Sequence, residues 1–238
     1  LSFLASDMTK LAAQYEPAKA AFTKLRDVAR QKMDAGSKNR DVIFDWFTLC
    51  EIVGDKDGIL VWFEKAKDEK KSAAVISTMD YKLFDLLVEH KRWADAGLLE
   101  KDPVAAAQTS VDMDKLTSKM NQGSDQFDAE TKAMFKKERN QRLLNDFAQR
   151  YACCLAAEKN EEATDIAKIF LEYQNNTDAR VALVEWAMKV NQPREEQLNW
   201  LDEVAENGAS VKSLRKKVQD ALAIQSQENA KKKVPATP

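Results

Sequence analysis

Glycine and proline are scarce in this sequence, which has six glycines and five prolines among 238 residues. Both residues interrupt helices and populate turns, so their scarcity disfavours a loop-rich protein or one built from many short strands. No run of β-branched residues alternates with polar residues for long enough to predict a strand. The abundant Ala, Leu, Lys, Glu, Gln and Asp instead predict helix over nearly the whole chain.

Reactive and metal-ligating groups are also few. His90 is the only histidine, and the spacing predicts that it lies at a helix end, where an imidazole meets terminal carbonyl groups. Zinc sites need several Cys or His ligands at short spacing, and the sequence has none. It also lacks a phosphate-binding Gly-rich loop and a nucleophile elbow. We therefore expect no metal, no cofactor and no catalytic site.

The three cysteines, Cys50, Cys153 and Cys154, do not form a disulfide framework, because their number is odd and two are adjacent. Adjacent helical residues point about 100° apart, which places Cys153 and Cys154 poorly for pairing. We interpret all three as small buried apolar residues. This pattern favours a reducing compartment, and we expect the cytoplasm.

Long apolar runs are missing, and the charges nearly balance. No run approaches the roughly 18–20 residues that span a bilayer. The 37 basic and 39 acidic residues provide no general attraction to nucleic acid, and the basic runs at 136–142 and 231–233 are interpreted as solvated faces. Residues 1–10 do not resemble a signal peptide. The chain does not begin with Met, which leaves open that it is processed or part of a longer protein.

The first 33 residues carry an apolar stripe at spacings of three and four. Pro17 disfavours one unbroken helix, because proline is tolerated at the first position of a helix and costs roughly 3 kcal/mol inside one. We therefore predict a break near Tyr15–Glu16 and a hairpin that buries the stripe between its own two helices; a single kinked helix is the alternative. The stripe consists of Leu4, Met8, Leu11, Tyr15, Ala18, Phe22, Leu25, Ala29 and Met33.

Helix–turn–helix units follow along the chain. Asp41 is predicted to cap a helix that reaches Val53, the stretch Gly54–Gly58 to turn the chain, and Ile59–Ala66 to form the return helix. The next helix, at about Thr78–His90, is apolar on nearly all sides, as is typical of an inner helix of a stack. Trp93–Leu99 is predicted to return antiparallel to it.

The second half repeats this pattern after a weak region. Residues 110–128 are polar and are predicted to be irregular, with one thin helix and a loop as the expected form, and to be the most mobile segment. Their apolar contacts are Val111, Met113, Leu116, Met120 and Phe127. Residues 129–158 are predicted to form one long helix or two. Further helices are expected at 163–173, 181–190 and from Pro193, then a terminal capping helix at 210–224 and a disordered tail at 225–238.

The turns between paired helices recur, falling near residues 13, 54, 91, 125, 158 and 192, at intervals of 41, 37, 34, 33 and 34. The stretch G-D-K-D-G-I-L-V-W-F-E-K-A resembles the turn and second helix of the tetratricopeptide repeat, and so do K-R-W-A-D-A-G-L-L, N-E-E-A-T-D-I-A-K-I-F and Y-E-P-A-K-A-A-F. This resemblance covers about residues 1–208. It implies an all-α fold, a right-handed array of antiparallel helical hairpins forming one domain over 1–224. A closed helical bundle is the competing prediction.

The resemblance is degenerate. Larger residues stand where the family places a small one midway along the first helix, namely Phe47, Phe84, Tyr151 and Glu185. Small residues of the second helix are present at Ala66, Ala96 and Ala163, whereas Ile59 and Glu196 replace others. The pitch of the array, and whether all six units stack regularly, are therefore open.

In the tetratricopeptide family the first helices line a concave groove that binds peptides or protein surfaces. The resemblance therefore implies a non-enzymatic scaffold or adaptor whose partner is a protein or peptide, and we expect no nucleic-acid partner. The alternative is a helical accessory domain of a larger enzyme or of a membrane-anchored protein. Phe44 and Trp186 pack against the neighbouring repeat in a competing interpretation. The positions of this sequence that match the outward, groove-lining positions of the family's first helices are Phe44, Thr48, Tyr81, Asp85, Ala148, Gln149, Ala182, Trp186 and Lys189.

Overall fold

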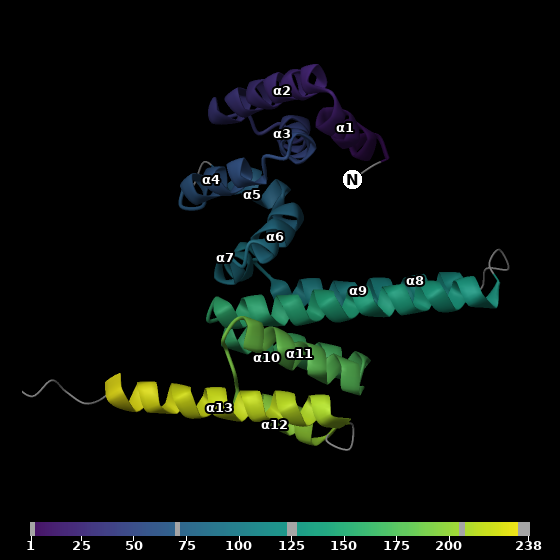
Figure 1. Ribbon diagram of the computed structural model, residues 1–238, viewed down its shortest axis with the longest axis vertical. Helices are drawn as coiled ribbons and strands as arrows, with labels where there is room; N and C mark the ends of the chain where they lie inside the picture. The colour runs from purple at the N-terminus through teal and green to yellow at the C-terminus, as the bar shows by residue number, and fades with distance from the viewer. Residues whose placement is uncertain (1–2, 70–71, 123–127, 205–207, 233–238) are drawn as a thin grey trace, which may run out of the picture. The chain divides into compact units, whose positions relative to one another are not determined.

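A computed structural model describes residues 3–69, 72–122, 128–204 and 208–232 (Figure 1). Over these residues the chain forms thirteen α-helices and no strand, so the predicted all-α class is confirmed. The helices are α1 (Phe3–Gln14), α2 (Glu16–Asp34), α3 (Arg40–Val53), α4 (Lys56–Ala66), α5 (Ala73–Thr78), α6 (Asp80–Glu89), α7 (Trp93–Leu99), α8 (Pro103–Gln122), α9 (Ala129–Ala156), α10 (Asn160–Tyr173), α11 (Thr177–Lys189), α12 (Glu195–Asp202) and α13 (Gly208–Lys232).

The chain divides into two compact units, Leu1–Lys91 (unit 1) and Arg92–Pro238 (unit 2). Each unit is described by itself. The single domain expected over residues 1–224 stays a prediction.

Unit 1 has an aromatic core between α3 and α4. The ring centroids of Trp46 and Phe47 are 4.9 Å apart, and those of Trp46 and Trp62 are 5.2 Å apart, both edge to face. Helix α2 packs along α3, and α1 packs on both. Arg26 of α2 reaches the turn after α3, where its Nη1 lies 2.7 Å from Oδ2 of Asp55. The aromatic core and this ion pair together hold α2, α3 and α4 as one body.

Unit 2 is built around α9, on which α7, α10 and α11 pack. Phe147 and Phe170 are fully buried and stacked, with ring centroids 4.6 Å apart. Helix α7 approaches α9 so closely that a Cβ on Gly97 would overlap the backbone carbonyl of Cys153. Only glycine fits at this contact. The long helices α8 and α9 lie side by side and extend beyond α10 and α11 (Figure 1).

Tyr151 and Gln197 form a buried hydrogen-bonded pair inside unit 2. The buried Tyr151 hydroxyl accepts a 3.0 Å bond from Nε2 of Gln197, itself fully buried. Tyr151 Oη also lies 3.3 Å from a carboxylate oxygen of Glu196. Burial raises the pKa of the Tyr151 hydroxyl, so the group stays protonated and can donate to Glu196. This network satisfies polar atoms that would otherwise destabilise the core.

Several helix ends share one backbone geometry. Gly54, Lys91, Glu158 and Asn191 follow α3, α6, α9 and α11, and all four have positive φ. After three of these residues the next amide donates back into the helix: Asp55 N to Cys50 O at 2.8 Å, Lys159 N to Cys154 O at 2.9 Å, and Gln192 N to Ala187 O at 2.9 Å. These bonds close the helices with left-handed caps, at or beside the predicted turn positions.

The structure confirms the predicted break near Pro17, because α1 ends at Gln14 and α2 begins at Glu16. The expectation that the two helices bury their stripe between themselves was wrong. Leu4, Leu11 and Leu25 are about half exposed or more, whereas Ala29 and Met33 are buried. Helix α2 directs its buried face mainly at α3, which therefore leaves part of the stripe uncovered.

Other boundaries also differ from the predictions. Asn39, and not Asp41, caps α3, its Oδ1 accepting from the Asp41 amide at 2.9 Å. Residues 110–122 belong to α8, which contains no internal glycine or proline, so the thin helix expected in this region is present and is longer than predicted; residues 123–127 lie outside the described part. Helix α9 is a single helix.

Helix α13 shows a further difference. It continues to Lys232, so residues 225–232 are helical where disorder was expected. No proline interrupts the sequence between the start of α13 and Pro235. Residues 233–238 lie outside the described part. The N-terminal half of α13 packs on α12 through a cluster that contains Leu201, Val211 and Val218. The role of α13 as the cap of a repeat array stays a prediction.

Candidate protein-binding groove

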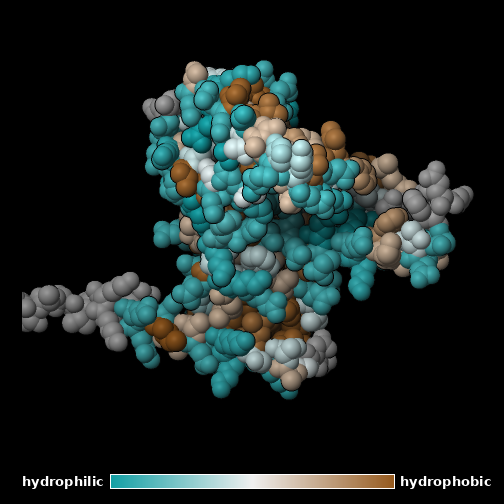
Figure 2. Space-filling view, turned by 45° about the horizontal axis from the view of Figure 1, so that its top comes forward, coloured by the Kyte–Doolittle hydropathy of each residue, from teal (hydrophilic) through white to brown (hydrophobic). Residues whose placement is uncertain are grey.

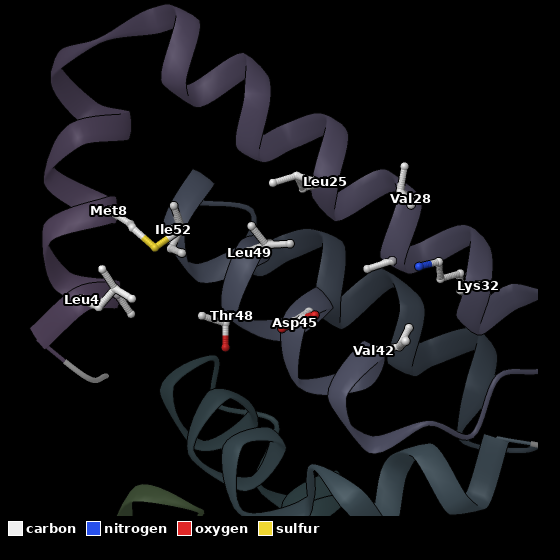
Figure 3. Close-up of a pocket in the computed structure, with 12 residues that line it drawn as sticks. Leu4, Met8, Leu25, Val28, Lys32, Val42, Asp45, Thr48, Leu49 and Ile52 are labelled. Carbon is white, nitrogen blue, oxygen red and sulfur yellow. The ribbon is translucent and has the colours of Figure 1, made fainter.

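An open, largely apolar groove of about 410 Å³ lies within unit 1, over α3 and between α1 and α2 (Figure 3). In the close-up, Leu4 and Met8 come from α1, and Leu25 and Val28 from α2, and they face the residues of α3 across the hollow. The lining is Leu4, Ala5, Met8, Leu25, Val28, Ala29, Lys32, Val42, Asp45, Thr48, Leu49 and Ile52.

Local sequence signals fix the three helices around the groove. Pro17 stands at the start of α2, where its missing amide proton is not needed. The Asn39 cap starts α3, and the left-handed Gly54 ends it. Ala29 and Met33 of α2 are buried, and so are Ala5 of α1 and Ile52 of α3. The buried residues hold the helices together, and their neighbours on the same stripes form the open walls.

The walls expose apolar side chains that the described residues of the unit leave uncovered. Leu4 is 69% exposed, Leu25 55% and Val28 48%. Hydrophobic patches open to solvent are also visible in the space-filling view among mostly hydrophilic residues (Figure 2). Scattered apolar residues are normal on a surface, but several gathered in one hollow are typical of an interaction site.

Two charged residues line the groove. The charged residues are Lys32 and Asp45. In the close-up, Lys32 and Val42 lie at the end of the groove far from α1, and Asp45 lies between Val42 and Thr48 (Figure 3). Other charges of α2 are engaged elsewhere: Arg30 Nε lies 2.9 Å from Oδ1 of Asp34, and Arg26 pairs with Asp27 and Asp55. The groove is therefore apolar towards α1 and carries one charge of each sign near its opposite end.

The predicted outward positions of unit 1 fall in different places. Thr48 lines the groove. Phe44 is half-buried, and the guanidinium carbon of Arg40 lies 5.1 Å from its ring centroid. Tyr81 and Asp85 of α6 are exposed and do not line the groove. Of these four residues, the structure therefore brings only Thr48 to the hollow.

In unit 2, the predicted positions Gln149, Ala182 and Trp186 are half-buried, and Lys189 is exposed. Ala148, the neighbour of Gln149, is fully buried. The ammonium nitrogen of Lys189 lies 3.9 Å from the centroid of the Trp186 ring, at cation–π distance. Trp186 and Lys189 thus form a local pair on α11.

The sequence predictions missed the contributions of α1 and α2 to the groove. Their apolar residues were assigned to a closed hairpin, and the spacing of three and four does indicate an apolar stripe. The stripe is wider than the surface that α3 can cover, and the excess forms the walls. The mixture of buried Ala29 and Met33 with exposed Leu25 and Val28 on one helix shows this division.

A second hollow of about 350 Å³ in unit 1 is more polar. It is bounded by α2, the loop after it and α4, with Arg30, Met33, Trp62 and Lys65 among its residues. Trp62 is 6% exposed, so its ring offers little surface, and Arg30 is already paired with Asp34. The groove over α3 therefore offers the larger uncovered apolar surface.

The three cysteine thiols are buried and held in their protonated, unreactive form. The thiols of Cys50, Cys153 and Cys154 are buried, and burial raises the pKa of each to about 12. His90 is exposed at the end of α6. No group of three or more His, Cys, Asp or Glu side chains in the described residues is arranged to hold a metal ion.

Within the part of the chain that the structure describes, none of the helices has the length and apolar character needed to cross a membrane. Comparison with protein-family models, curated proteins and solved structures finds no match to the chain.

Proposed function

We propose that this protein is a non-enzymatic scaffold that binds an amphipathic helix of another protein in the groove of unit 1. The carrying observation is the 410 Å³ hollow walled by the half-exposed Leu4, Leu25 and Val28. Covering these three side chains contributes on the order of 3 kcal/mol before the costs of association. Such a surface suits recognition through apolar burial.

A helix is the form of partner that fits the walls. The backbone groups of α1, α2 and α3 are bonded within their own helices, so these walls offer no strand edge to an extended peptide. A helix with apolar residues at i, i+3, i+4 and i+7 would lay them between Leu4 and Leu25. Charged residues near one end of that helix would meet Lys32 and Asp45.

We further propose that the helical pairs form a tetratricopeptide-like array. The left-handed caps at Gly54, Lys91, Glu158 and Asn191 support this proposal, because they stand at or beside the turns of the predicted repeat. The close approach of Gly97 to α9 supports it as well, since the family packs small residues between its helices. Tyr81, Asp85, Gln149, Ala182, Trp186 and Lys189 remain predicted contacts of such an array.

The proposal is tested by photo-crosslinking in cells. Benzoylphenylalanine is placed at Thr48, inside the groove, and separately at Gln31, an exposed residue of α2 outside it. The Thr48 probe is expected to capture segments whose sequenced peptides carry helical apolar spacing. Captured segments without this spacing, or the same segments captured from both positions, would overturn the proposal.

A matched pair of charge variants sharpens the test. Val28→Glu places a carboxylate on the apolar wall and is expected to reduce capture by at least about tenfold, because a charge would be buried under the partner. Gln31→Glu adds the same charge outside the groove and should leave capture unchanged. Val28 is 48% exposed, so the substitution leaves the core of unit 1 intact.

A further inference from the structure

Helix α8 has a second apolar stripe, separate from the groove. Its members recur at alternating spacings of three and four, and their side chains point away from the core of unit 2. Met113 is 57% exposed, Leu116 52% and Met120 68%. Ala106 and Thr109 extend this row towards the N-terminus of α8. The five residues together follow the a/d pattern of a coiled-coil seam.

The opposite face of α8 is anchored, which fixes the direction of the stripe. Ala107 and Val111 are buried in the core of unit 2. Asp114, 8% exposed, lies 2.8 Å from Nε of Arg139 and accepts a 2.6 Å bond from the Tyr173 hydroxyl. Helix α8 therefore cannot rotate to bury Met113 and Leu116 without breaking these contacts.

We propose that α8 pairs with α8 of a second copy of this chain in an antiparallel coiled coil. In that register Met113 packs against Leu116 of the partner subunit, and Thr109 packs against Met120 of the partner subunit. The stripe is thus complementary to itself about a two-fold axis, as a closed dimer interface must be. The inference is independent of the groove, which lies in the other unit.

The flanking charges select the antiparallel direction. Asp112 and Lys119 both precede a stripe residue and are both exposed. In an antiparallel pair, Asp112 meets Lys119 of the partner subunit, once on each side of the axis. In a parallel pair, Asp112 would instead meet Thr117 of the partner subunit and gain no opposite charge. The seam from Ala106 to Met120 spans only about two heptads, so the dimer is expected to be weak and concentration-dependent.

Sedimentation velocity over a range of protein concentrations tests the association. The wild-type chain is expected to shift from monomer to dimer, and Met113→Glu to weaken the dimer by at least about tenfold. Leu98→Glu places the same charge on an apolar residue of α7 that is 62% exposed and lies outside the stripe, and it should leave association unchanged. A chain that stays monomeric throughout, or a dimer that Met113→Glu leaves intact, would overturn the proposal.

Disulfide trapping tests the register. Two single variants, Met113→Cys and Leu116→Cys, are prepared separately and mixed under mild oxidation. The antiparallel register predicts crosslinking mainly in the mixture, because residue 113 faces residue 116. Crosslinking of Met113→Cys with itself would overturn this register, since it indicates parallel helices. The native cysteines are buried and are not expected to interfere.

The charge pair gives a third readout. Asp112→Lys alone is expected to weaken the dimer, and the double variant Asp112→Lys/Lys119→Asp to restore it, because the exchanged charges meet again. Failure of the double variant to restore association would contradict the antiparallel pairing of these flanks.

Discussion

The helices packed around α3 in unit 1 and those packed around α9 in unit 2 differ in how completely they cover their apolar stripes. Unit 1 buries Trp46, Phe47 and Trp62 but leaves Leu4, Leu25 and Val28 open in a groove. In unit 2, the helices α7, α10 and α11 pack around α9, and Gly97 of α7 lies against the backbone carbonyl of Cys153. The comparison teaches that similar stripes become buried core or exposed surface according to how many neighbouring helices face them.

The largest expected effects come from emptying each core. Phe47→Ala in unit 1 and Phe147→Ala in unit 2 each remove a side chain that is at most 1% exposed, and each should lower the free energy of unfolding of its own unit by about 4 kcal/mol. Amide hydrogen exchange measures the two units separately. Val61→Ala, at a site 56% exposed, is the control and should cost about 0.5 kcal/mol or less. Equal loss of protection in both units from either variant would show that they unfold as one.

The close packing in unit 2 predicts the next largest effect. Gly97→Ala should destabilise unit 2 by about 3 kcal/mol, because its Cβ would overlap the carbonyl of Cys153 and force α7 away from α9. Urea unfolding measures the loss. Leu98→Ala changes the adjacent residue, which is 62% exposed, and should change stability little. A tolerated Gly97→Ala would contradict the tight contact that distinguishes unit 2.

Alkaline pH is expected to lower the stability of the two units to different extents, because they contain different numbers of buried thiols. Burial raises the pKa of Cys50, Cys153 and Cys154 to about 12, whereas an unfolded thiol ionises near pH 8.5. The folded state therefore holds protons that the unfolded state releases. Stability is fully present below about pH 8.5 and falls as pH rises towards 12, by up to about 1.4 kcal/mol per pH unit for each thiol.

Two of these thiols lie in unit 2 and one in unit 1, so unit 2 should lose stability more steeply above pH 9. Urea unfolding as a function of pH measures the slope. Cys50→Ala should flatten the slope of unit 1, and Cys153→Ala/Cys154→Ala that of unit 2. Slopes unchanged by these substitutions would assign the alkaline loss to other groups.

The smallest predicted effect concerns the helix caps. Unit 1 has glycine at the left-handed cap after α3, whereas unit 2 has Glu158 after α9. Glu158→Gly should raise stability by about 0.5 kcal/mol, because glycine adopts positive φ without the steric penalty of a side chain. Calorimetry should show a small rise in Tm. Ala157→Gly, one residue earlier at φ −88°, should lower Tm instead.

Local signals allowed much of the fold to be predicted. The break before Pro17, the turn at Gly54 and the helix pair around it follow from residues that act within a few positions of themselves. The groove could not be predicted in this way. Whether Leu25 is core or wall depends on how much of α2 faces α3, and spacing along one helix does not contain that information.

Helix α8 shows the same limit more sharply. Met113, Leu116 and Met120 were expected to be its apolar contacts, yet the structure exposes them and buries Asp114 on the other face. Asp114 is held by Arg139 and Tyr173, which come from α9 and α10. A buried carboxylate is stable only with such partners, and they are distant in sequence.

Each unit is joined mainly through helices that are near neighbours along the chain, as α1 is with α3 and α9 with α11. Loops that close over short separations lose little chain entropy, so these contacts can form early. During synthesis, the groove of unit 1 would be complete once α3 has left the ribosome, before α8 has emerged. If both proposals hold, a nascent chain binds its helical partner before it dimerises.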